Sequence, residues 1–348
     1  PNKISKGSLK KLKKISIENA LIKILSSPNH SNKSWITEQY DQMVMCDTAQ
    51  KSGTDAAIIR IHNKDKAIAV SVDSSANYCK SFPLTGGKQI VCESWRNLIT
   101  VGAKPLAITN CLNFGNPENE EIMGEFVECL EGIKETCEFL DYPVVSGNVS
   151  FYNGTNKKNI YPTPVIGGVG LITKLSKPLN HNFKQENSHL VLIGKTFGHI
   201  EQSCFLKENY SIIEGMPPEI NLLNEKNNGE ILLKLINENL VLSSHDVSSG
   251  GLIITISEMT FSSEIGAKIL KPKQLANFAN YLFGEDQARY VVEIASDNLS
   301  KAEKLMKDSN IYYEIIGFTQ KSYLEVEDEF KISVKDLFKI NNEWYNNY

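Results

Sequence analysis

The sequence predicts an α+β protein with two domains. Its 348 residues are enough for about two domains of ordinary size. Over residues 55–172, the apolar spacing predicts segments in the order strand, strand, helix, strand, helix, strand, strand. A polar stretch over 174–188 then interrupts this pattern. We therefore expect a basic linker and helix over 1–34, a first domain over 35–175 and a second domain over 185–348.

The first elements have recognisable start and stop signals. Ser16 is a typical N-cap residue, and the helical apolar spacing that begins at Ile17 ends before Pro28. Two strand-like runs, over 56–61 and 67–72, are separated by a short polar turn and predict a hairpin.

The remaining elements follow from apolar periodicity. In the first domain we expect helices over 88–101 and 118–138 and strands beginning at 105, over 143–145 and over 165–172. In the second domain we expect strands over 189–193, 290–294 and 312–316, and helices near 229–239, 250–262 and 298–308.

Composition excludes several classes of protein. Hydrophobic residues make up 41% of the chain and charged residues 22%, which excludes a wholly disordered or collagen-like chain. No run of 18 apolar residues occurs, so we expect no transmembrane helix. Seven cysteines without a CxxC pair are typical of reduced thiols in a cytoplasmic protein. The chain starts at Pro1 without a Met, which suggests processing or a longer parent protein.

The N-terminal region is strongly basic. Residues 1–34 contain eight lysines and one acidic residue, whereas the whole chain has a net charge of −4. Such an arm can bind nucleic acid or a membrane surface. It contains no arginine and no aromatic residue before Trp35, so we favour a solvated linker and expect no nucleic-acid or membrane partner.

Standard nucleotide-binding and hydrolase signatures are absent from the sequence. Gly194-Lys195-Thr196 ends like a P-loop, but His189 stands where the first glycine is required. Gly168 and Gly170 begin a dinucleotide fingerprint that lacks its third glycine. What remains is a set of polar segments at strand ends: Asp73–Asn77, Thr85–Lys88, Thr109–Pro117, Ser146–Ser150, Ser244–Leu252 and Gly284–Arg289.

Together these segments favour a Mg²⁺–nucleotide site without a P-loop, although an ordinary turn explains each one alone as well or better. Asp73 and Asp246 offer carboxylates to a hard cation. The glycines of Thr85–Lys88 and of Gly250-Gly251 precede predicted helices, where exposed N–H groups suit a phosphate. His245 and Asp246 are not expected to form a catalytic dyad, because neighbouring residues of a strand point in opposite directions.

Six ordered motifs resemble the phosphoribosylformylglycinamidine synthase family, and specifically the C-terminal half of its synthetase subunit. The resemblance covers about residues 17–320 and rests on Gly53–Ala57, Thr85–Lys88, Leu112–Pro117, Gly147–Ser150, Tyr161–Pro164 and His245–Leu252. It implies a two-domain half of a PurM-like synthetase. The first domain would supply a sheet with flanking helices to a barrel-like pseudo-dimer core, and the second would be an α/β sandwich.

The resemblance also implies a function in de novo purine biosynthesis. The family is an ATP-dependent C–N ligase that uses Mg²⁺ and glutamine-derived ammonia to convert formylglycinamide ribonucleotide to formylglycinamidine ribonucleotide. The implied partners are the N-terminal half of the synthetase, a glutamine amidotransferase subunit and a small bridging subunit; a homodimer of the isolated half is a further expectation. The alternative is a non-catalytic half that holds a nucleotide or supports assembly. A selenophosphate- or thiamine-phosphate-kinase-like enzyme is disfavoured by Leu112–Pro117.

Site residues are likewise implied by the resemblance. It assigns Asn110 and Gly147 to ATP, Asn148 to Mg²⁺ and Ser150 to the ribonucleotide; Asn110 stands where the family usually has Asp. An auxiliary pseudo-site is implied at Asp73, Asn97, Asp246, Glu285, Asp286 and Gln287. The catalytic His belongs to the other half, so we expect no catalytic residue in this chain and an inactive chain when it is alone.

Overall fold

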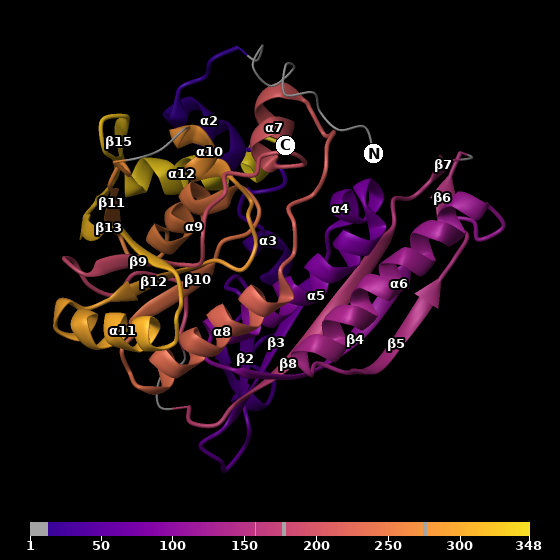
Figure 1. Cartoon of the computed structure of the whole chain (residues 1–348), viewed down its shortest axis with the longest axis horizontal. Helices are drawn as coiled ribbons and strands as arrows, with labels where there is room; N and C mark the ends of the chain where they lie inside the picture. The colour runs from indigo at the N-terminus through magenta and orange to yellow at the C-terminus, as the bar shows by residue number, and fades with distance from the viewer. Residues whose placement is uncertain (1–12, 157, 176–178, 274–276) are drawn as a thin grey trace.

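The computed structural model describes residues 13–156, 158–175, 179–273 and 277–348. The predicted α+β class is confirmed, because the described residues form a six-stranded sheet and a seven-stranded sheet with helices packed on both (Figure 1). Within these residues, no helix has the length and apolar character needed to cross a membrane.

The first sheet has the strand order β1-β2-β3-β8-β4-β5. All neighbouring strands are antiparallel except β4 and β5, which run parallel. The predicted hairpin is confirmed as β2 and β3, with Arg60 opposite Ala67. The strands are β1 (Thr48–Gln50), β2 (Ala57–Arg60), β3 (Ala67–Asp73), β4 (Lys104–Asn113), β5 (Val144–Ser150) and β8 (Thr163–Ile172). A separate ribbon joins β6 (Gly154–Thr155) to β7 (Lys158–Asn159).

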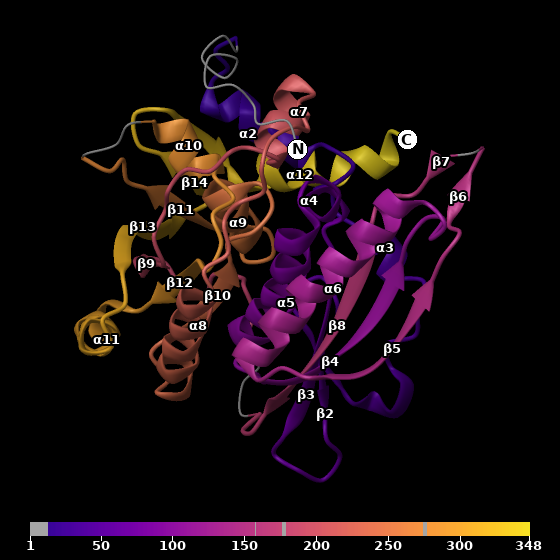
Figure 2. The same ribbon diagram turned by 45° about the vertical axis from the view of Figure 1, so that its right-hand side comes forward.

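Helices cover one face of this sheet. The helices α4 (Ala76–Ser81), α5 (Pro83–Thr100) and α6 (Glu120–Leu140) lie on that side (Figure 2). The period-two alternation of β3 and β8 directs buried residues toward α5. The opposite face is open and apolar. It carries a row formed by Ile59, Ile68 and Leu171, which pair across neighbouring strands, and by Val72 on β3.

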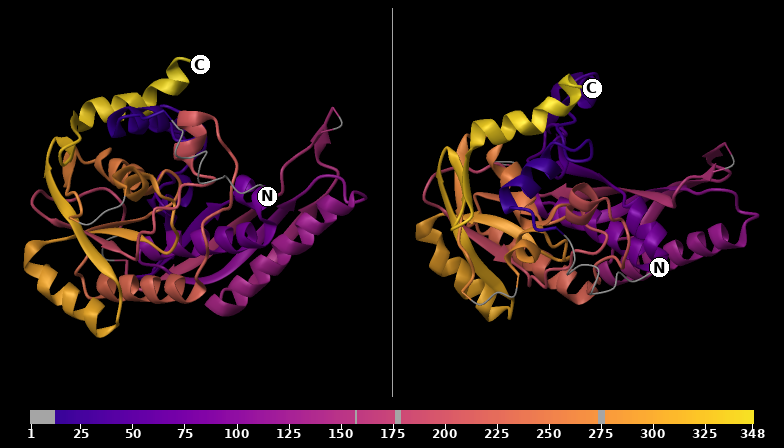
Figure 3. Two further views of the ribbon diagram at one scale, coloured as in Figure 1. Left: turned by 45° about the horizontal axis from the view of Figure 1, so that its top comes forward. Right: turned by 90° about the horizontal axis from the view of Figure 1, so that it is seen from above.

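The second sheet lies between two helical layers. Its strand order is β10-β12-β9-β13-β11-β14-β15. Helices lie on both sides of this sheet (Figure 3). Alternate residues of β9 belong to different cores: Val191 and Ile193 pack with α8 and α11, while Leu190 and Leu192 pack with α2, α9 and α12. The strands are β9 (His189–Ile193), β10 (Ser243–Asp246), β11 (Ile265–Ile269), β12 (Tyr290–Ile294), β13 (Tyr313–Lys321), β14 (Tyr323–Val326) and β15 (Phe330–Ser333).

The helices of this part belong to the same two layers or to the connections between them. They are α2 (Ile17–Leu25), α7 (Cys204–Tyr210), α8 (Leu222–Asn237), α9 (Gly251–Thr260), α10 (Phe278–Phe283), α11 (Ser296–Asp308) and α12 (Val334–Asn346). The short helices α3 (Ser34–Thr37) and η1 (Val44–Cys46) lead into β1. The predicted N-cap of α2 is confirmed, since Ser16 Oγ accepts a hydrogen bond from Asn19 N at 3.3 Å. Residues 1–12, with four of the eight lysines of the basic N-terminal region, lie outside the described residues.

The phosphate-binding interpretation of Thr85–Lys88 is wrong. The helix begins at Pro83 rather than at residue 88, so Gly86 and Gly87 lie inside α5. Gly86 N already donates to Phe82 O at 2.9 Å. A Cβ atom at Gly86 would lie 2.5 Å from Cys79 Cα, and one at Gly87 would lie 2.3 Å from Cys129 O. These glycines therefore allow α4 and α6 to pack closely on α5.

Two other polar segments are strands rather than turns. The strand expected to begin at 105 continues to Asn113, and the strand expected over 143–145 continues to Ser150. Their polar residues resemble a turn in the sequence because one face of the sheet is open at this edge, where apolar side chains are not required. Apolar periodicity also gave no prediction for the short elements β11, β14 and β15 or for α12.

Candidate functional site

The four residues assigned to ATP, Mg²⁺ and substrate lie on the neighbouring strands β4 and β5. Asn110 pairs with Gly147, Cys111 with Asn148 and Asn113 with Ser150. The parallel pairing therefore brings together residues that are about 40 positions apart in the sequence. The same row extends across the sheet, because Ile166 of β8 pairs with Asn110 on one side and with Asp73 on the other. With neighbouring strands about 4.8 Å apart, Asp73 and Asn110 are separated by about 10 Å.

Strand alternation divides the four residues between the two faces of the sheet. Asn110 and Gly147 belong to the face covered by α6, and a Cβ atom at Gly147 would lie 2.0 Å from Asn110 Oδ1. Asn148 and Ser150 are each offset by an odd number of residues from Gly147, so they face the open side. Asn148 is exposed there and Ser150 is half-buried. The two pairs can therefore contact a ligand only from opposite sides or around the edge formed by β5.

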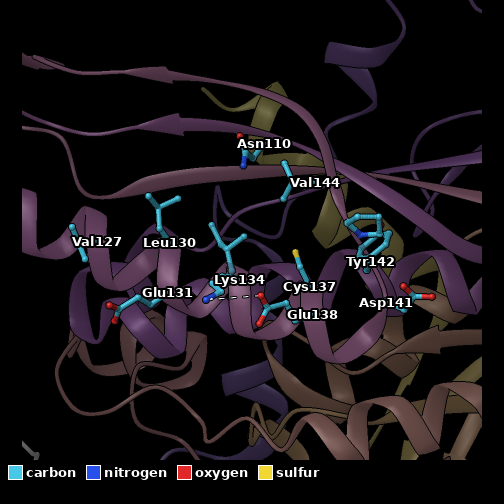
Figure 4. Close-up of a pocket in the computed structure, with 12 residues that line it drawn as sticks. Asn110, Val127, Leu130, Glu131, Lys134, Cys137, Glu138, Asp141, Tyr142 and Val144 are labelled. Atoms are coloured by element: carbon cyan, nitrogen blue, oxygen red, sulfur yellow. Dashed lines mark ion pairs between the residues drawn. The ribbon is translucent and has the colours of Figure 1, made fainter.

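A cavity of about 630 Å³ lies between Asn110 and α6 (Figure 4). Its walls are largely apolar, with Leu130 and Ile133 on α6 and Val144 at the start of β5. Charged residues lie along α6 beside it, and Lys134 Nζ is 3.9 Å from Glu138 Oε1. Sequence reasoning did not include α6 in the site, although the helix itself was predicted. The missing information was which face of α6 turns toward β4.

Hydrogen bonds hold the turn that follows β5. Asn153 Nδ2 donates to Ser150 O at 2.9 Å and to Phe114 O at 3.0 Å, and Ser150 Oγ donates to Asn153 Oδ1 at 3.2 Å. Asn159 Oδ1 accepts from Asn116 N at 3.0 Å. The Leu112–Pro117 segment is thus fixed against the end of β5, and Asn153 and Asn159 are functional candidates that the sequence motifs did not include.

The auxiliary residues gather around a buried arginine. Arg96 on α5 is fully buried and donates to Asp246 Oδ2 at 3.2 Å, to Gln287 Oε1 at 3.0 Å and to Glu225 Oε1 at 2.8 Å. Asn97 Nδ2 donates to Asp73 Oδ1 at 2.7 Å. The structure therefore brings Asp246 and Gln287 together. Asp73 on β3 and Asn97 on α5 form a second pair nearby.

Glu285 and Asp286 bind backbone amides of neighbouring loops. Glu285 Oε1 accepts from Cys204 N at 2.7 Å and from Gly250 N at 2.8 Å, and Tyr78 Oη donates to Glu285 Oε2 at 2.6 Å. Asp286 accepts from the amides of Phe197, Gly198 and His199. Gly250 N is thus already used inside the protein, so the interpretation of Gly250-Gly251 as a free phosphate-binding turn is not supported. Asp286 and Gln287 also line a cavity of about 350 Å³ with His199 and Asn224.

The buried carboxyl groups of the auxiliary cluster repel one another when they are ionised, which favours binding of a cation among them. Asp73 Oδ2 is buried and has no hydrogen-bond partner among the described residues. Burial and the nearby Glu93 carboxylate raise the pKa of Asp73 well above its usual range. Burial also raises the pKa of Glu93 to about 7, and Asp246 adds to this shift. A divalent cation would relieve this repulsion between carboxyl groups. Glu93 was missed because one acid within an amphipathic helix gives no signal in the sequence.

His245 does not form a hydrogen-bonded dyad with Asp246. The nearest approach of the two side chains is 3.6 Å, between His245 Nδ1 and Asp246 Oδ1. Asp246 instead bonds to Arg96, and His245 Nε2 lies 3.1 Å from Glu258 Oε2. This agrees with the expectation from strand geometry.

Comparison with known families identifies both parts of the chain. Residues 53–172 match the N-terminal domain of AIR synthase related protein, and residues 185–328 match the C-terminal domain. The chain belongs to the AIR synthase related family. Each matched range contains most of one of the two large sheets of this AIR synthase related chain, with β1 and β15 lying just outside the matched ranges.

Curated relatives carry the name phosphoribosylformylglycinamidine synthase subunit PurL. The protein from Pelagibacter ubique (strain HTCC1062) is 52% identical over 346 residues, which are 99% of this chain and 47% of that protein. The protein from Bradyrhizobium sp. (strain ORS 278) is 43% identical over 330 residues, which are 94% of this chain and 45% of that protein. The chain thus spans about half the length of the curated relatives it matches.

Solved structures show the same fold at low sequence identity. Thermotoga maritima PurL complexed with FGAR superposes with a TM-score of 0.73 at 14% identity, covering 96% of this chain and 55% of that one. The same protein complexed with ATP gives a TM-score of 0.71 at 16% identity, with 92% and 52% covered. A HypE–HypF complex chain gives 0.64 at 18% identity, with 86% of this chain and 97% of that chain covered.

Proposed function

We propose that the chain is the second half of a phosphoribosylformylglycinamidine synthase, the ATP-dependent ligase that converts formylglycinamide ribonucleotide to formylglycinamidine ribonucleotide with glutamine-derived ammonia. The observation that carries the proposal is the 52% identity to a PurL subunit along 99% of the chain. The pairing of Asn110 with Gly147 and of Asn113 with Ser150 supports it, because it places the assigned residues side by side on the neighbouring strands β4 and β5.

Within that enzyme, Asn110 and Gly147 contact ATP, Asn148 binds Mg²⁺ and Ser150 contacts the ribonucleotide. The donor set fits these roles, since the exposed amide oxygen of Asn148 suits a hard cation and the half-buried hydroxyl of Ser150 suits a polar substrate. Gly147 leaves room for the Asn110 side chain beside the cavity. When bound, Mg²⁺ would offset negative charge on the phosphates.

The auxiliary residues have two roles in this proposal. Asp73 and Asn97, with Glu93, form the cation-binding part of a pseudo-symmetric nucleotide pocket, which the unpartnered Asp73 Oδ2 supports. Asp246, Glu285, Asp286 and Gln287 position the surrounding loops and α5, because their oxygens accept hydrogen bonds from Arg96 or from backbone amides.

The open face of the first sheet is the surface for the other half of the synthetase. Ile68 is 38% exposed and Val72 is 72% exposed, and apolar sheet faces of this kind are typical of protein interfaces. The N-terminal half would cover these residues of the open face and bring its own residues to Asn148 and Ser150.

The amidotransferase and bridging subunits complete the proposed assembly. In this assembly, residues 35–175 and 185–348 act as its two domains.

The test is reconstitution of the ligase from the chain and its partner half. The expected result is ATP- and Mg²⁺-dependent product formation by the pair and none by the chain alone. Asn148→Ala should reduce the activity of the pair at least tenfold. Ser146→Ala is the matched control, because Ser146 lies two residues away on the same face and bonds to Thr109. Full activity of the isolated chain would contradict the proposal.

The replacement of the family's usual Asp by Asn110 favours a second candidate, a half that holds a nucleotide or supports assembly without taking part in the reaction. This candidate predicts that Asn148→Ala and Ser150→Ala leave the activity of the pair unchanged while Val72→Lys, on the open face, abolishes assembly. Nucleotide binding is measured by the increase in the thermal unfolding midpoint on addition of Mg²⁺–ATP. Mg²⁺–ADP serves as the comparison. A ligand at 100 times its dissociation constant stabilises the folded state by about 2.7 kcal/mol.

A further inference from the structure

A second group of possible ligands lies outside the residues used so far. Asp55 precedes β2, His181 lies in the segment between the two sheets, and His245 lies on β10. One ligand atom from each of these three residues lies within 4.8 Å of the other two. Asp55 Oδ1 is 2.9 Å from His245 Nδ1 and 3.4 Å from His181 Nδ1. The two imidazole rings are stacked, with their centroids 4.8 Å apart.

Two buried polar atoms in this group have no hydrogen-bond partner among the described residues. They are Asp55 Oδ2 and His245 Nδ1. The Asp55 side chain is only 3% exposed, so water does not satisfy it from bulk solvent. His245 Nδ1 lies 2.9 Å from Asp55 Oδ1, which is an ion-pair distance when Nδ1 carries a proton, but the two groups are not aligned as in a hydrogen bond. Leaving such atoms unpaired is costly, which points to a missing positive ligand.

The second ring nitrogen of His245, Nε2, has the carboxylate partner that is typical of metal-binding histidines. Its Nε2 lies 3.1 Å from Glu258 Oε2 on α9, so Nε2–H donates to a carboxylate. In the neutral ring this fixes the lone pair on Nδ1, which faces Asp55 and His181. Metal-bound histidines commonly donate their second ring N–H to a carboxylate in this way.

We propose that Asp55, His181 and His245 bind a divalent transition-metal ion of the zinc class, with Glu258 as the carboxylate that orients His245. Two imidazoles and one carboxylate suit Zn²⁺ better than Mg²⁺, which prefers oxygen ligands and octahedral geometry. Tetrahedral Zn²⁺ with bonds of about 2.0–2.1 Å separates its ligand atoms by about 3.3 Å, close to the two distances observed. His181 is 12% exposed, which leaves access for a fourth ligand from solvent.

Zn²⁺ competes with a proton for Nδ1 of His245. Binding of Zn²⁺ forms the Nδ1–Zn bond and releases that proton to the buffer, so affinity falls as pH is lowered. Because Asp55 lies just before β2 of the first sheet, His245 on β10 of the second sheet and His181 in the segment between them, the ion would fix the two parts of the chain to each other.

The test is metal binding by the full chain after dialysis against a chelator. Calorimetry should show one Zn²⁺ per chain, with proton release that scales with the ionisation enthalpy of the buffer. Co²⁺ should give the visible absorption of a tetrahedral site. Mg²⁺ alone should neither give the signal nor displace Zn²⁺. His181→Gln should reduce Zn²⁺ affinity more than 100-fold, and Glu258→Gln should reduce it 10–100-fold.

His62→Gln is the matched control. His62 Nδ1 lies 3.4 Å from Asp47 Oδ1, the same separation as in the His181–Asp55 pair, and the His62 side chain is 65% exposed. This variant should retain wild-type affinity. The proposal is overturned if the wild-type chain binds no Zn²⁺ and gives no Co²⁺ absorption at pH 7.5, or if His181→Gln and His62→Gln bind equally. Should His181→Gln fail to fold, the wild-type spectrum and Glu258→Gln still decide the question.

Discussion

The side-chain oxygen of Asn110 occupies the space that a Cβ atom on Gly147 would need. The two residues are paired on β4 and β5, and a Cβ atom at Gly147 would approach Asn110 Oδ1 to 2.0 Å, far inside van der Waals contact. Because Gly147 has no side chain, the amide of Asn110 can lie beside the cavity that α6 lines.

Gly147→Ala should displace Asn110 and destabilise the chain by about 1–3 kcal/mol, as overpacking does. Chemical denaturation measures this, and Mg²⁺–ATP should no longer raise the unfolding midpoint. Adding Asn110→Ala should recover part of the lost stability, because the clashing side chain is then absent. Gly124→Ala on α6 is the control. A Cβ atom there meets nothing within 4 Å, so the variant should gain up to about 1 kcal/mol. Unchanged stability of Gly147→Ala would contradict the clash.

Arg96→Met should be among the most destabilising substitutions in the chain. It leaves Asp246, Glu225 and Gln287 buried without their donor, which costs about 3–5 kcal/mol for a broken buried ion pair. Denaturant unfolding gives the free-energy difference. Arg60→Met is the comparison, because the Arg60–Asp47 pair lies at the surface and should contribute little. Similar losses in the two variants would show that burial of the Arg96 cluster has no energetic consequence.

Stability should fall as pH rises from about 4.5 to about 7 because of Glu93. Its pKa is raised to about 7 in the folded chain, so the folded state holds a proton that the unfolded state releases at lower pH. Glu93→Gln should therefore be more stable than the wild type above pH 7, by about 1–3 kcal/mol, and the difference should shrink toward pH 4. Unfolding free energies across this range test the sign. Glu230→Gln, on the exposed side of α8, should leave the pH dependence unchanged.

The isolated chain should self-associate through the open face of its first sheet. Ile59, Ile68 and Val72 are exposed on neighbouring strands, and covering them with a second copy buries apolar surface. Val72→Lys should shift the chain toward monomer in sedimentation or size-exclusion experiments at micromolar concentration. Leu223→Lys removes another largely exposed apolar residue, on α8, and should change nothing. A wild-type chain that is monomeric under these conditions would refute the expectation.

Much of the fold could be predicted because long elements have clear apolar periods. The β2–β3 hairpin, α2 with its Ser16 cap, and α6 all follow from local pattern and capping. The start of α5 could not be predicted in this way. Pro83 is a good residue for the first turn of a helix, but Gly86 and Gly87 suggest a loop in the sequence. Only their close contacts with α4 and α6 explain why two glycines lie inside the helix.

The candidate site was predictable only as a set of motifs. That Asn110 and Gly147 face α6 whereas Asn148 and Ser150 face the open side depends on strand register, which the sequence does not specify. Glu93, Glu225 and His181 were not singled out, since each becomes significant only through partners more than a hundred residues away or on another element. Long-range pairing of this kind leaves no local signal.

The Arg96 cluster has a consequence for how the protein can be divided. Arg96 belongs to α5, whereas Asp246, Glu225 and Gln287 belong to β10, α8 and the strand entrance at β12, and apolar residues of both parts share one core. Neither domain can be cut away without exposing charged groups that only the other neutralises. The chain should thus melt in a single cooperative transition, and gene fragments encoding one domain should yield aggregated protein rather than smaller working modules.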